Sequence, residues 1–288
     1  MTALPRVIIL GASGHIGRSL EEALVREGAE VMGHSSKTLD LTRPEALSIL
    51  DGIVNPDAVL VFAAALTPDR GQNIGTLITN LAMAANVGRY LETHPVGRCV
   101  YLSSDAVYGF DANPVTEKAP AAPASYYALA KYAAERLLEW VAAARGVSLL
   151  CLRVTAVFGP GDPHSAYGPN AFARSLARER AIHLFGDGEE ERDHIYVEDV
   201  ARLITELIRV RASGLLNLAT GESRPFRDVA KTMCDLVPYD ATVRTVPRRG
   251  SITHRRYDTT RLQAAVPGFR FTPFEVALRE TLQAFGAI

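Results

Sequence analysis

Short apolar runs alternate with amphipathic segments along the first half of the chain. Residues 7–10 (VIIL) and 58–65 (AVLVFAAA) are continuous apolar runs, as a strand buried on both faces requires. Between them, Ile16, Leu20 and Leu24 recur at a spacing of four residues. That spacing predicts a helix with one apolar face, lying directly after the first strand.

The same patterns predict further elements along the rest of the chain. Alternation of strands and helices specifies a parallel sheet that carries helices on both faces. We therefore predict the α/β class, with a doubly wound parallel sheet (Rossmann) of six or seven strands and a smaller C-terminal substrate lobe. The other predicted strands cover residues 30–32, 99–102, 147–154 and 215–219, and the other predicted helices 80–91, 126–144, 198–210, 225–236 and 273–285.

The composition of the chain changes after residue 158. Glycine and proline cluster between residues 159 and 169, and the chain from residue 243 onward is polar and basic. We predict that residues 1–158 plus 193–237 form a dinucleotide-binding domain. Residues 159–192 plus 238–288 are predicted to form the small substrate-binding lobe.

The composition and charge of the chain exclude some classes of binding partner. Of the 288 residues, 48% are hydrophobic and 22% charged, and the formal net charge is −1. Without a basic stripe, nucleic acid is a poor electrostatic partner. An uninterrupted apolar stretch of about 20 residues, which a membrane-spanning helix needs, is absent from the sequence. The first strand begins close to the N-terminus, so we expect no signal peptide and a cytoplasmic location. The three cysteines form no CxxC pair, so we predict no metal site.

Three glycines follow the first predicted strand and open the first helix. Gly11, Gly14 and Gly17 lie in the run GASGHIG. Such glycines permit a tight turn, close approach of a pyrophosphate and close packing of helix on strand, while the helix N-terminus favours anions. A glycine motif alone also suits an ordinary turn, but the strand before it and the helix after it favour a dinucleotide site.

The end of the second strand bears on the choice of cofactor. NAD enzymes usually place an acid there for the ribose 2′-hydroxyl. Here the run is GHSSK, residues 33–37, and the first acid is Asp40. Ser35, Ser36 and Lys37 suit a 2′-phosphate, so NADP is favoured over NAD; the alternative is a solvated loop without a role.

Tyr127 and Lys131 lie four residues apart on a predicted helix, so they share one face. A nearby ammonium stabilises a phenolate and should lower the pKa of the tyrosine towards neutral pH. Ser103, Ser104 and Asp105 leave a predicted strand at the edge where parallel sheets bind ligands. A hydroxyl there can bond the reacting oxygen, and a carboxylate can move a proton; turn capping is the structural alternative for the serines.

These residues belong to a set of motifs that resembles one known family. The runs GASGHIG, VFAAA, SSDAVYG, YALAK, RVTAVFGPGD, FGDGEEERDHIYVEDVA and DTTRLQ are similar to those of extended short-chain dehydrogenases/reductases, in the NAD-dependent epimerase/dehydratase group that acts on nucleotide sugars. The resemblance implies that Ser104, Tyr127 and Lys131 are the catalytic triad, and that Asp105 has an auxiliary role in proton transfer.

The resemblance also implies binding residues. Arg192 and Arg249 resemble arginines that contact the substrate diphosphate, and Asn170 lies where epimerases hold their nucleotide; Ser104 is expected to contact the sugar. The predicted cofactor-binding residues are Gly11, Ser13, Gly14, His15, Ile16, Gly17, Ser35, Ser36, Lys37, Asp40, Leu41, Ala63, Ala64, Ala65, Asn80, Tyr127 and Lys131.

Departures from the family pattern shape the expected reaction. Ala106 stands where dehydratases carry glutamate, so a 4,6-dehydratase is not expected, and Ala156 replaces a usual asparagine. We expect an epimerase or keto-sugar reductase that uses NADP or NAD on a nucleotide-diphosphate sugar, as a homodimer. Two alternatives remain: an NADPH-dependent reductase of a non-sugar carbonyl, and a non-catalytic regulator that senses the dinucleotide.

Overall fold

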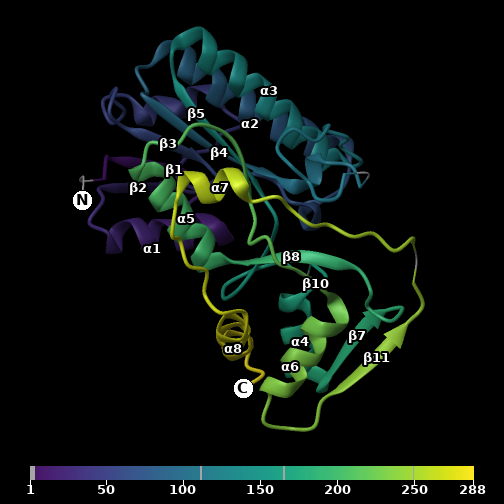
Figure 1. Cartoon of the computed structure of the whole chain (residues 1–288). Helices are drawn as coiled ribbons and strands as arrows, with labels where there is room; N and C mark the ends of the chain where they lie inside the picture. The colour runs from purple at the N-terminus through teal and green to yellow at the C-terminus, as the bar shows by residue number, and fades with distance from the viewer. Residues whose placement is uncertain (1–3, 111, 165, 249) are drawn as a thin grey trace.

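Six parallel strands form the main sheet of the computed structural model, which describes residues 4–110, 112–164, 166–248 and 250–288 (Figure 1). Their order across the sheet is β2-β1-β3-β4-β5-β9. The order reverses between β1 and β3, which creates the switch point where open α/β sheets bind ligands. The strands are β1 (Val7–Leu10), β2 (Val31–His34), β3 (Val59–Phe62), β4 (Arg98–Ser104), β5 (Ser148–Val154) and β9 (Gly214–Leu218).

Helices cover both faces of this sheet, because its strands are apolar on both sides. In β1, Val7 and Ile9 join the apolar cluster under one helical layer, while Ile8 and Leu10 join the cluster under the other. One layer consists of α1 (His15–Arg26), α5 (Val197–Arg209) and α7 (Thr260–Ala265). The other consists of α2 (Ile74–Thr93), α3 (Tyr126–Arg145) and the 3₁₀ segment η1 (Pro44–Leu50). The predicted doubly wound α/β fold is confirmed.

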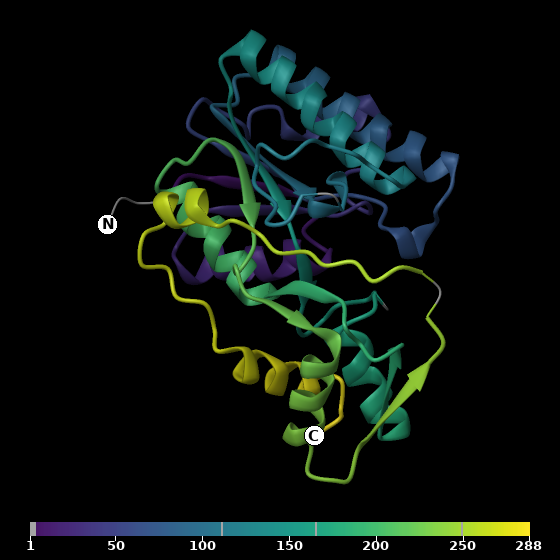
Figure 2. The ribbon, with the colours of Figure 1, turned by 45° about the vertical axis from the view of Figure 1, so that its right-hand side comes forward.

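A second group of elements lies below the sheet, and Figures 1 and 2 agree on its position. Its helices are α4 (Pro169–Glu179), α6 (Phe226–Leu236) and α8 (Phe274–Ala284), which share one apolar cluster. A three-stranded sheet in the order β10-β8-β6 and a parallel pair, β7 with β11, complete it. The strands are β6 (Ala156–Phe158), β7 (Ala181–Phe185), β8 (Glu191–Tyr196), β10 (Ser223–Pro225) and β11 (Thr242–Val246).

The chain then returns from the lower group to the main sheet. Residues 250–259, called here the crossing segment, run from the region after β11 back towards α7 (Figure 1). An isolated bridge joins Tyr257 of this segment to Val115, which follows β4 in the main domain. Two short 3₁₀ turns, η2 (Pro68–Arg70) and η3 (Asp105–Val107), follow β3 and β4.

Some elements differ from the predicted ones. Helix α2 begins at Ile74, six residues before the predicted start at Asn80, because Asn73 and Thr76 form a reciprocal capping box. Strands β6, β8, β10 and β11 and helix α7 were not predicted. The division into two domains stays a prediction; α6 packs with α4 and α8, whereas α7 packs on the main sheet.

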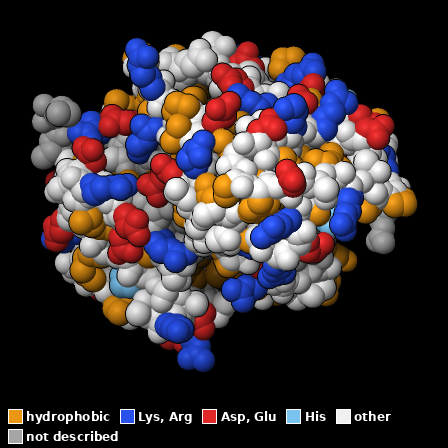
Figure 3. Space-filling model, turned by 90° about the horizontal axis from the view of Figure 1, so that it is seen from below, with side chains coloured by type: hydrophobic (Ala, Val, Ile, Leu, Met, Phe, Trp, Pro, Cys, Tyr) orange, Lys and Arg blue, Asp and Glu red, His pale blue; other side chains and the backbone are white. Residues whose placement is uncertain are grey.

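The surface of the molecule carries both signs of charge. Basic and acidic side chains are interspersed over the face that is seen from below (Figure 3). No helix among the described residues is both long enough and apolar enough to cross a membrane.

Candidate active site

The glycine turn forms a tight cradle between β1 and α1. A Cβ on Gly11, whose φ is +100°, would lie 2.7 Å from the amide nitrogen of Ala64. A Cβ on Gly17 would overlap the carbonyl oxygen of Gly11. No side chain caps the first turn of α1, so its N–H groups remain for another acceptor. This cradle fits the pyrophosphate of a dinucleotide, which needs close backbone approach and N–H donors.

The loop after β3 forms the other side of the switch point. Ala63, Ala64 and Ala65 lie there and are partly exposed. The Asn80 amide group accepts a hydrogen bond from the Leu66 nitrogen (2.7 Å) and donates to the Leu66 oxygen (3.0 Å). Asn80 therefore fixes the loop that carries the alanines, which is an indirect contribution to a cofactor site.

The end of β2 forms a closed turn rather than an extended loop. The Ser35 hydroxyl accepts a hydrogen bond from the Lys37 nitrogen (3.3 Å), and Ser36 and Lys37 are exposed. The Asp40 carboxylate accepts bonds from the nitrogen and hydroxyl of Thr42, so it is directed along the chain, while Leu41 beside it is buried.

His34 is a residue in this region that the sequence interpretation missed. Both of its ring nitrogens are buried without a hydrogen-bond partner among the described residues, and burial lowers the pKa of the ring. It lies at the C-terminal end of β2, beside Gly11 and Ala12, whose nitrogens donate to its carbonyl oxygen. In the sequence, His34 could have been found from its position directly before Ser35, at the end of the second predicted strand.

Strand β4 and helix α3 bring the predicted catalytic residues together. Ser104 ends β4, and α3 begins at Tyr126 behind a Ser125 cap, so Tyr127 and Lys131 lie in its first two turns. The Lys131 ammonium donates to the Leu102 oxygen of β4 (2.7 Å) and lies 5.8 Å from the centroid of the Tyr127 ring. The Ser104 side chain lowers the pKa of Tyr127, so the two hydroxyl groups lie near each other.

Burial, not Lys131, dominates the protonation of this group. Burial raises the pKa of Tyr127 to about 12, the Ser104 interaction opposes it, and the charge of Asp105 adds to it. Burial also lowers the pKa of Lys131 to about 8, against opposing contributions from Cys151 and Glu135. The predicted lowering of the Tyr127 pKa by Lys131 is therefore not observed in this structure, because desolvation of the phenolate is the larger effect.

A buried ionic network supports the catalytic helix from behind. Glu135, one turn after Lys131, forms a bidentate ion pair with Arg153 of β5 at 2.6 and 2.9 Å, and both side chains are about 95% buried. Ser103 also donates a hydrogen bond to Glu135. This satisfies Ser103, so Ser104 is left as the serine that faces the Tyr127 phenol. Removing one partner of such a pair strands a buried charge and is strongly destabilising.

Two of the predicted substrate residues, Arg192 and Asn170, lie in the lower group of elements, whereas Ser104 ends β4. The Arg192 guanidinium donates to the oxygen and hydroxyl of Thr253, at 2.7 and 3.0 Å, and so reaches the crossing segment. Asn170 is buried and bonds the Gly159 nitrogen (3.0 Å) and the Asp162 carboxylate (2.5 Å), which directs it towards its own loop. Arg249 lies outside the described residues.

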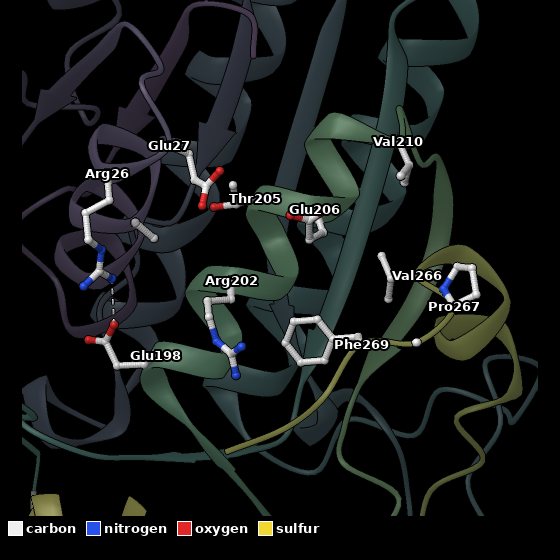
Figure 4. A pocket seen from close by; sticks show the side chains of 12 residues that line it. Arg26, Glu27, Glu198, Arg202, Thr205, Glu206, Val210, Val266, Pro267 and Phe269 are labelled. Atoms are coloured by element: carbon white, nitrogen blue, oxygen red, sulfur yellow. Dashed lines mark hydrogen bonds and ion pairs between the residues drawn. The ribbon is translucent and has the colours of Figure 1, made fainter. Parts of the chain in front are cut away.

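A separate groove lies away from these residues. It has a volume of about 800 Å³ and runs between α1, α5 and residues 266–269 (Figure 4). None of the predicted site residues lines it. Charged side chains pair across the groove, as Arg26 with Glu198 at 3.1 Å. The candidate site at the sheet edge is therefore separate from this groove.

Comparison with known proteins agrees with this geometry. The sequence profile of the NAD dependent epimerase/dehydratase family matches residues 7–219. The chain belongs to this family. The resemblance seen in the sequence motifs is thereby confirmed.

Individual relatives span almost the whole chain. The UDP-glucose 4-epimerase of Mycolicibacterium smegmatis is 27% identical, over 89% of this chain and 90% of the relative. The structure of the UDP-glucose 4-epimerase of Thermus thermophilus with NAD has a TM-score of 0.85 at 24% identity, covering 97% of this chain and 98% of that one. The structure of RMD from Pseudomonas aeruginosa with NADPH has a TM-score of 0.86 at 22% identity, covering 98% and 99%. At these identities the two structures support the fold alone.

The glycine cradle yields a first test. In Gly17→Ala the added methyl group meets the Gly11 oxygen, so the turn must shift. We expect affinity for the dinucleotide to fall by about tenfold or more, since overpacking costs about 1–3 kcal/mol. Calorimetric titration with NAD and NADP measures this. Gly250→Ala is the matched control, because a Cβ there meets nothing within 4 Å; equal affinities in the two variants would contradict the assignment.

Proposed function

We propose that this enzyme is an NAD(P)-dependent epimerase or keto-sugar reductase that acts on a nucleotide-linked sugar. The observation that carries the proposal is the meeting of Ser104, Tyr127 and Lys131 beside the glycine cradle, at the C-terminal edge of the parallel sheet. Relatives named as UDP-glucose 4-epimerase and GDP-L-fucose synthase support the class of substrate.

Each catalytic side chain has a definable task in this reaction. Ser104 and Tyr127 bond the oxygen of the reacting carbon. With a pKa near 12, Tyr127 is a phenol at neutral pH, so it is ready to donate a proton to a carbonyl oxygen; in the reverse direction it accepts one. A bound nicotinamide supplies or accepts the hydride.

Lys131 supplies hydrogen-bond donors and a positive charge to the same site. With a pKa near 8 it is mostly an ammonium at pH 7. One of its N–H groups is used by the Leu102 oxygen, and an ammonium has three donors. The other two are available to a cofactor ribose and to the phenol, whose deprotonated form the positive charge stabilises.

The substrate diphosphate is assigned to Arg192. Its guanidinium forms no ion pair within 4.0 Å among the described residues, and burial together with the charge of Arg255 lowers its pKa. An anion bound at Arg192 compensates for the burial of its charge and for the repulsion by Arg255. A guanidinium also binds phosphate oxygens in pairs. Asn170 acts in this proposal by shaping the loop between Gly159 and Asp162.

NADP is the cofactor that we favour. The Asp40 carboxylate is engaged by Thr42, so it does not take the role of the acid that binds a ribose 2′-hydroxyl. Ser36 and Lys37 are exposed next to the end of β2, where a 2′-phosphate would lie. The related structures contain NAD in one case and NADPH in the other, so both are compatible with the fold.

The proposed function is tested by turnover. The purified enzyme is incubated with UDP-, GDP- and dTDP-linked sugars and keto-sugars, and both NAD(P)H absorbance and sugar epimers are measured. Tyr127→Phe should reduce turnover by at least about a hundredfold while cofactor affinity stays close to wild type, because only the proton donor is lost. Near-normal turnover in this variant would overturn the assignment of Tyr127.

Arg192→Ala separates a nucleotide sugar from a non-sugar carbonyl substrate. A lost charge-assisted hydrogen bond is worth about 1.5–3 kcal/mol, so we expect UDP, GDP or dTDP to bind about ten- to a hundredfold more weakly. Arg227→Ala is the control, since Arg227 is an exposed arginine on α6. If wild type binds none of the three nucleotides, the nucleotide-sugar substrate is wrong and the non-sugar carbonyl is favoured.

We also propose a homodimer that forms through α2 and α3. Large apolar side chains are exposed on both helices, among them Ile74, Ile78, Leu129 and Trp140, the last of which is 69% exposed. Leu129 and Trp140 are eleven residues apart and so lie on one face of α3. Light scattering should give twice the monomer mass, and Trp140→Glu should shift it towards the monomer; a monomeric wild type would refute the dimer.

A further inference from the structure

Two residues of the crossing segment reach the turn that follows β4. The Tyr257 hydroxyl donates a hydrogen bond to Oδ2 of Asp105. Arg255 donates to the carbonyl oxygens of Asp105 and Tyr108, both at 2.9 Å. Both side chains are buried, with exposures of 5% for Arg255 and 6% for Tyr257. The contacts join positions about 150 residues apart in sequence, so a local motif does not reveal them.

The backbone of the crossing segment is fixed on two sides. On one side, Val115 donates to the Arg256 oxygen (2.7 Å) and accepts from the Asp258 nitrogen (3.0 Å). On the other, the Arg255 nitrogen donates to the Glu191 oxygen of β8 (3.0 Å). Tyr257 also packs in a small apolar cluster with Val107, Tyr108, Val115 and Ala219. These contacts fix the Tyr257 side chain, so its hydroxyl is held at Asp105.

Asp105 lies between Tyr257 and the catalytic groups. It follows Ser104 directly, and the Ser104 hydroxyl lies 3.4 Å from Oδ1 of Asp105. Its negative charge acts on Tyr127 and raises the pKa of that phenol. Tyr257, Asp105 and the Ser104–Tyr127 pair thus form a series in which each group is within interaction distance of the next.

We propose that Tyr257 is a positioning residue for the reaction, whose hydroxyl holds the Asp105 carboxylate in its place beside Ser104 and Tyr127. The negative charge of Asp105 at this place disfavours the phenolate and so retains the Tyr127 proton for delivery to a carbonyl oxygen. The inference rests on the proposed function, because it concerns the same proton transfer. It makes the crossing segment part of the active site.

The crossing segment also connects Tyr257 to Arg192, the arginine proposed to bind the substrate. Thr253, two residues before Arg255, is the partner of Arg192. An anion that draws Arg192 towards itself therefore acts on the same short segment that carries Tyr257. This connection links the lower group of elements to the proton donor through Tyr257 and Asp105.

Charged groups from several elements face Asp105. Arg192 and Asp193 of β8 interact with it electrostatically, as does Tyr127 of α3. Arg255 and Tyr257 face it from the crossing segment. Tyr257 donates to the carboxylate itself, whereas Arg255 donates to the backbone oxygen, so Tyr257 is the residue of this segment that can orient the side chain.

Tyr257→Phe tests the inference, because it removes the donor and keeps the ring. The Asp105 carboxylate then loses the contact that fixes it beside Ser104 and Tyr127. We therefore expect kcat to fall by about tenfold with KM nearly unchanged, because the proton transfer and not substrate binding is affected. Tyr132→Phe, whose ring packs beside the same cluster, should leave kcat unchanged.

A double-mutant cycle separates positioning from general support of the fold. In an Asp105→Asn background, which has no carboxylate to position, Tyr257→Phe should change kcat by less than about twofold. A loss in that background equal to the loss in wild type would show a structural role and overturn the inference.

A measurement that does not depend on turnover distinguishes a failure of this inference from a failure of the proposed function. ¹³C NMR of protein labelled at aspartate carboxyl groups, with the Asp105 signal assigned from Asp105→Asn, reports on the hydrogen bonds of this carboxylate directly. The Asp105 signal should move in Tyr257→Phe relative to wild type at the same pH, because the carboxylate loses one donor. An unshifted Asp105 refutes the inference even in an active enzyme, whereas a shifted Asp105 in an enzyme without nucleotide-sugar turnover refutes only the proposed function.

Discussion

Leu10 of β1, Phe62 of β3 and Tyr101 of β4 lie side by side in one parallel register. The residues that follow each strand therefore leave the sheet at the same edge. This pairing places the glycine turn after β1 against the alanines after β3, and it extends β4 by three further residues to Ser104. Helix α3 needs only to pack against β4 to bring Tyr127 and Lys131 to the same edge. The rest of the site depends on that shared register.

Burial decides the protonation of the groups at this edge. Desolvation moves a pKa by up to roughly 3–5 units, against roughly 1–3 for a neighbouring opposite charge. Tyr127 and Lys131 both follow the larger effect, since each is displaced towards its neutral form. At the buried Glu135–Arg153 pair the balance is the opposite, because the hydrogen bonds and charge of Glu135 outweigh burial and raise the pKa of Arg153. The candidate site thus combines a phenol that burial keeps protonated with a buried ion pair.

Particular residues show how far sequence reasoning extends. The glycine spacing and the Tyr127–Lys131 spacing predict local geometry, since each motif lies on one turn or one helix face, and the structure has both. The start of α2 was misplaced because its capping box lies outside the apolar pattern. Asp105 was singled out from its position, but its partners Arg255 and Tyr257 were not, because they come from a distant segment. Arg249 lies outside the described residues, so its role stays a prediction.

The sequence by itself determined the fold class and the family, and it predicted which side chains react. It did so because apolar periodicity and short motifs record interactions between residues that are near in the chain. Only the tertiary structure decided how those side chains are protonated and which of them are held in place. Those properties depend on burial and on contacts such as Tyr257 to Asp105, which exist only after the crossing segment returns to the sheet.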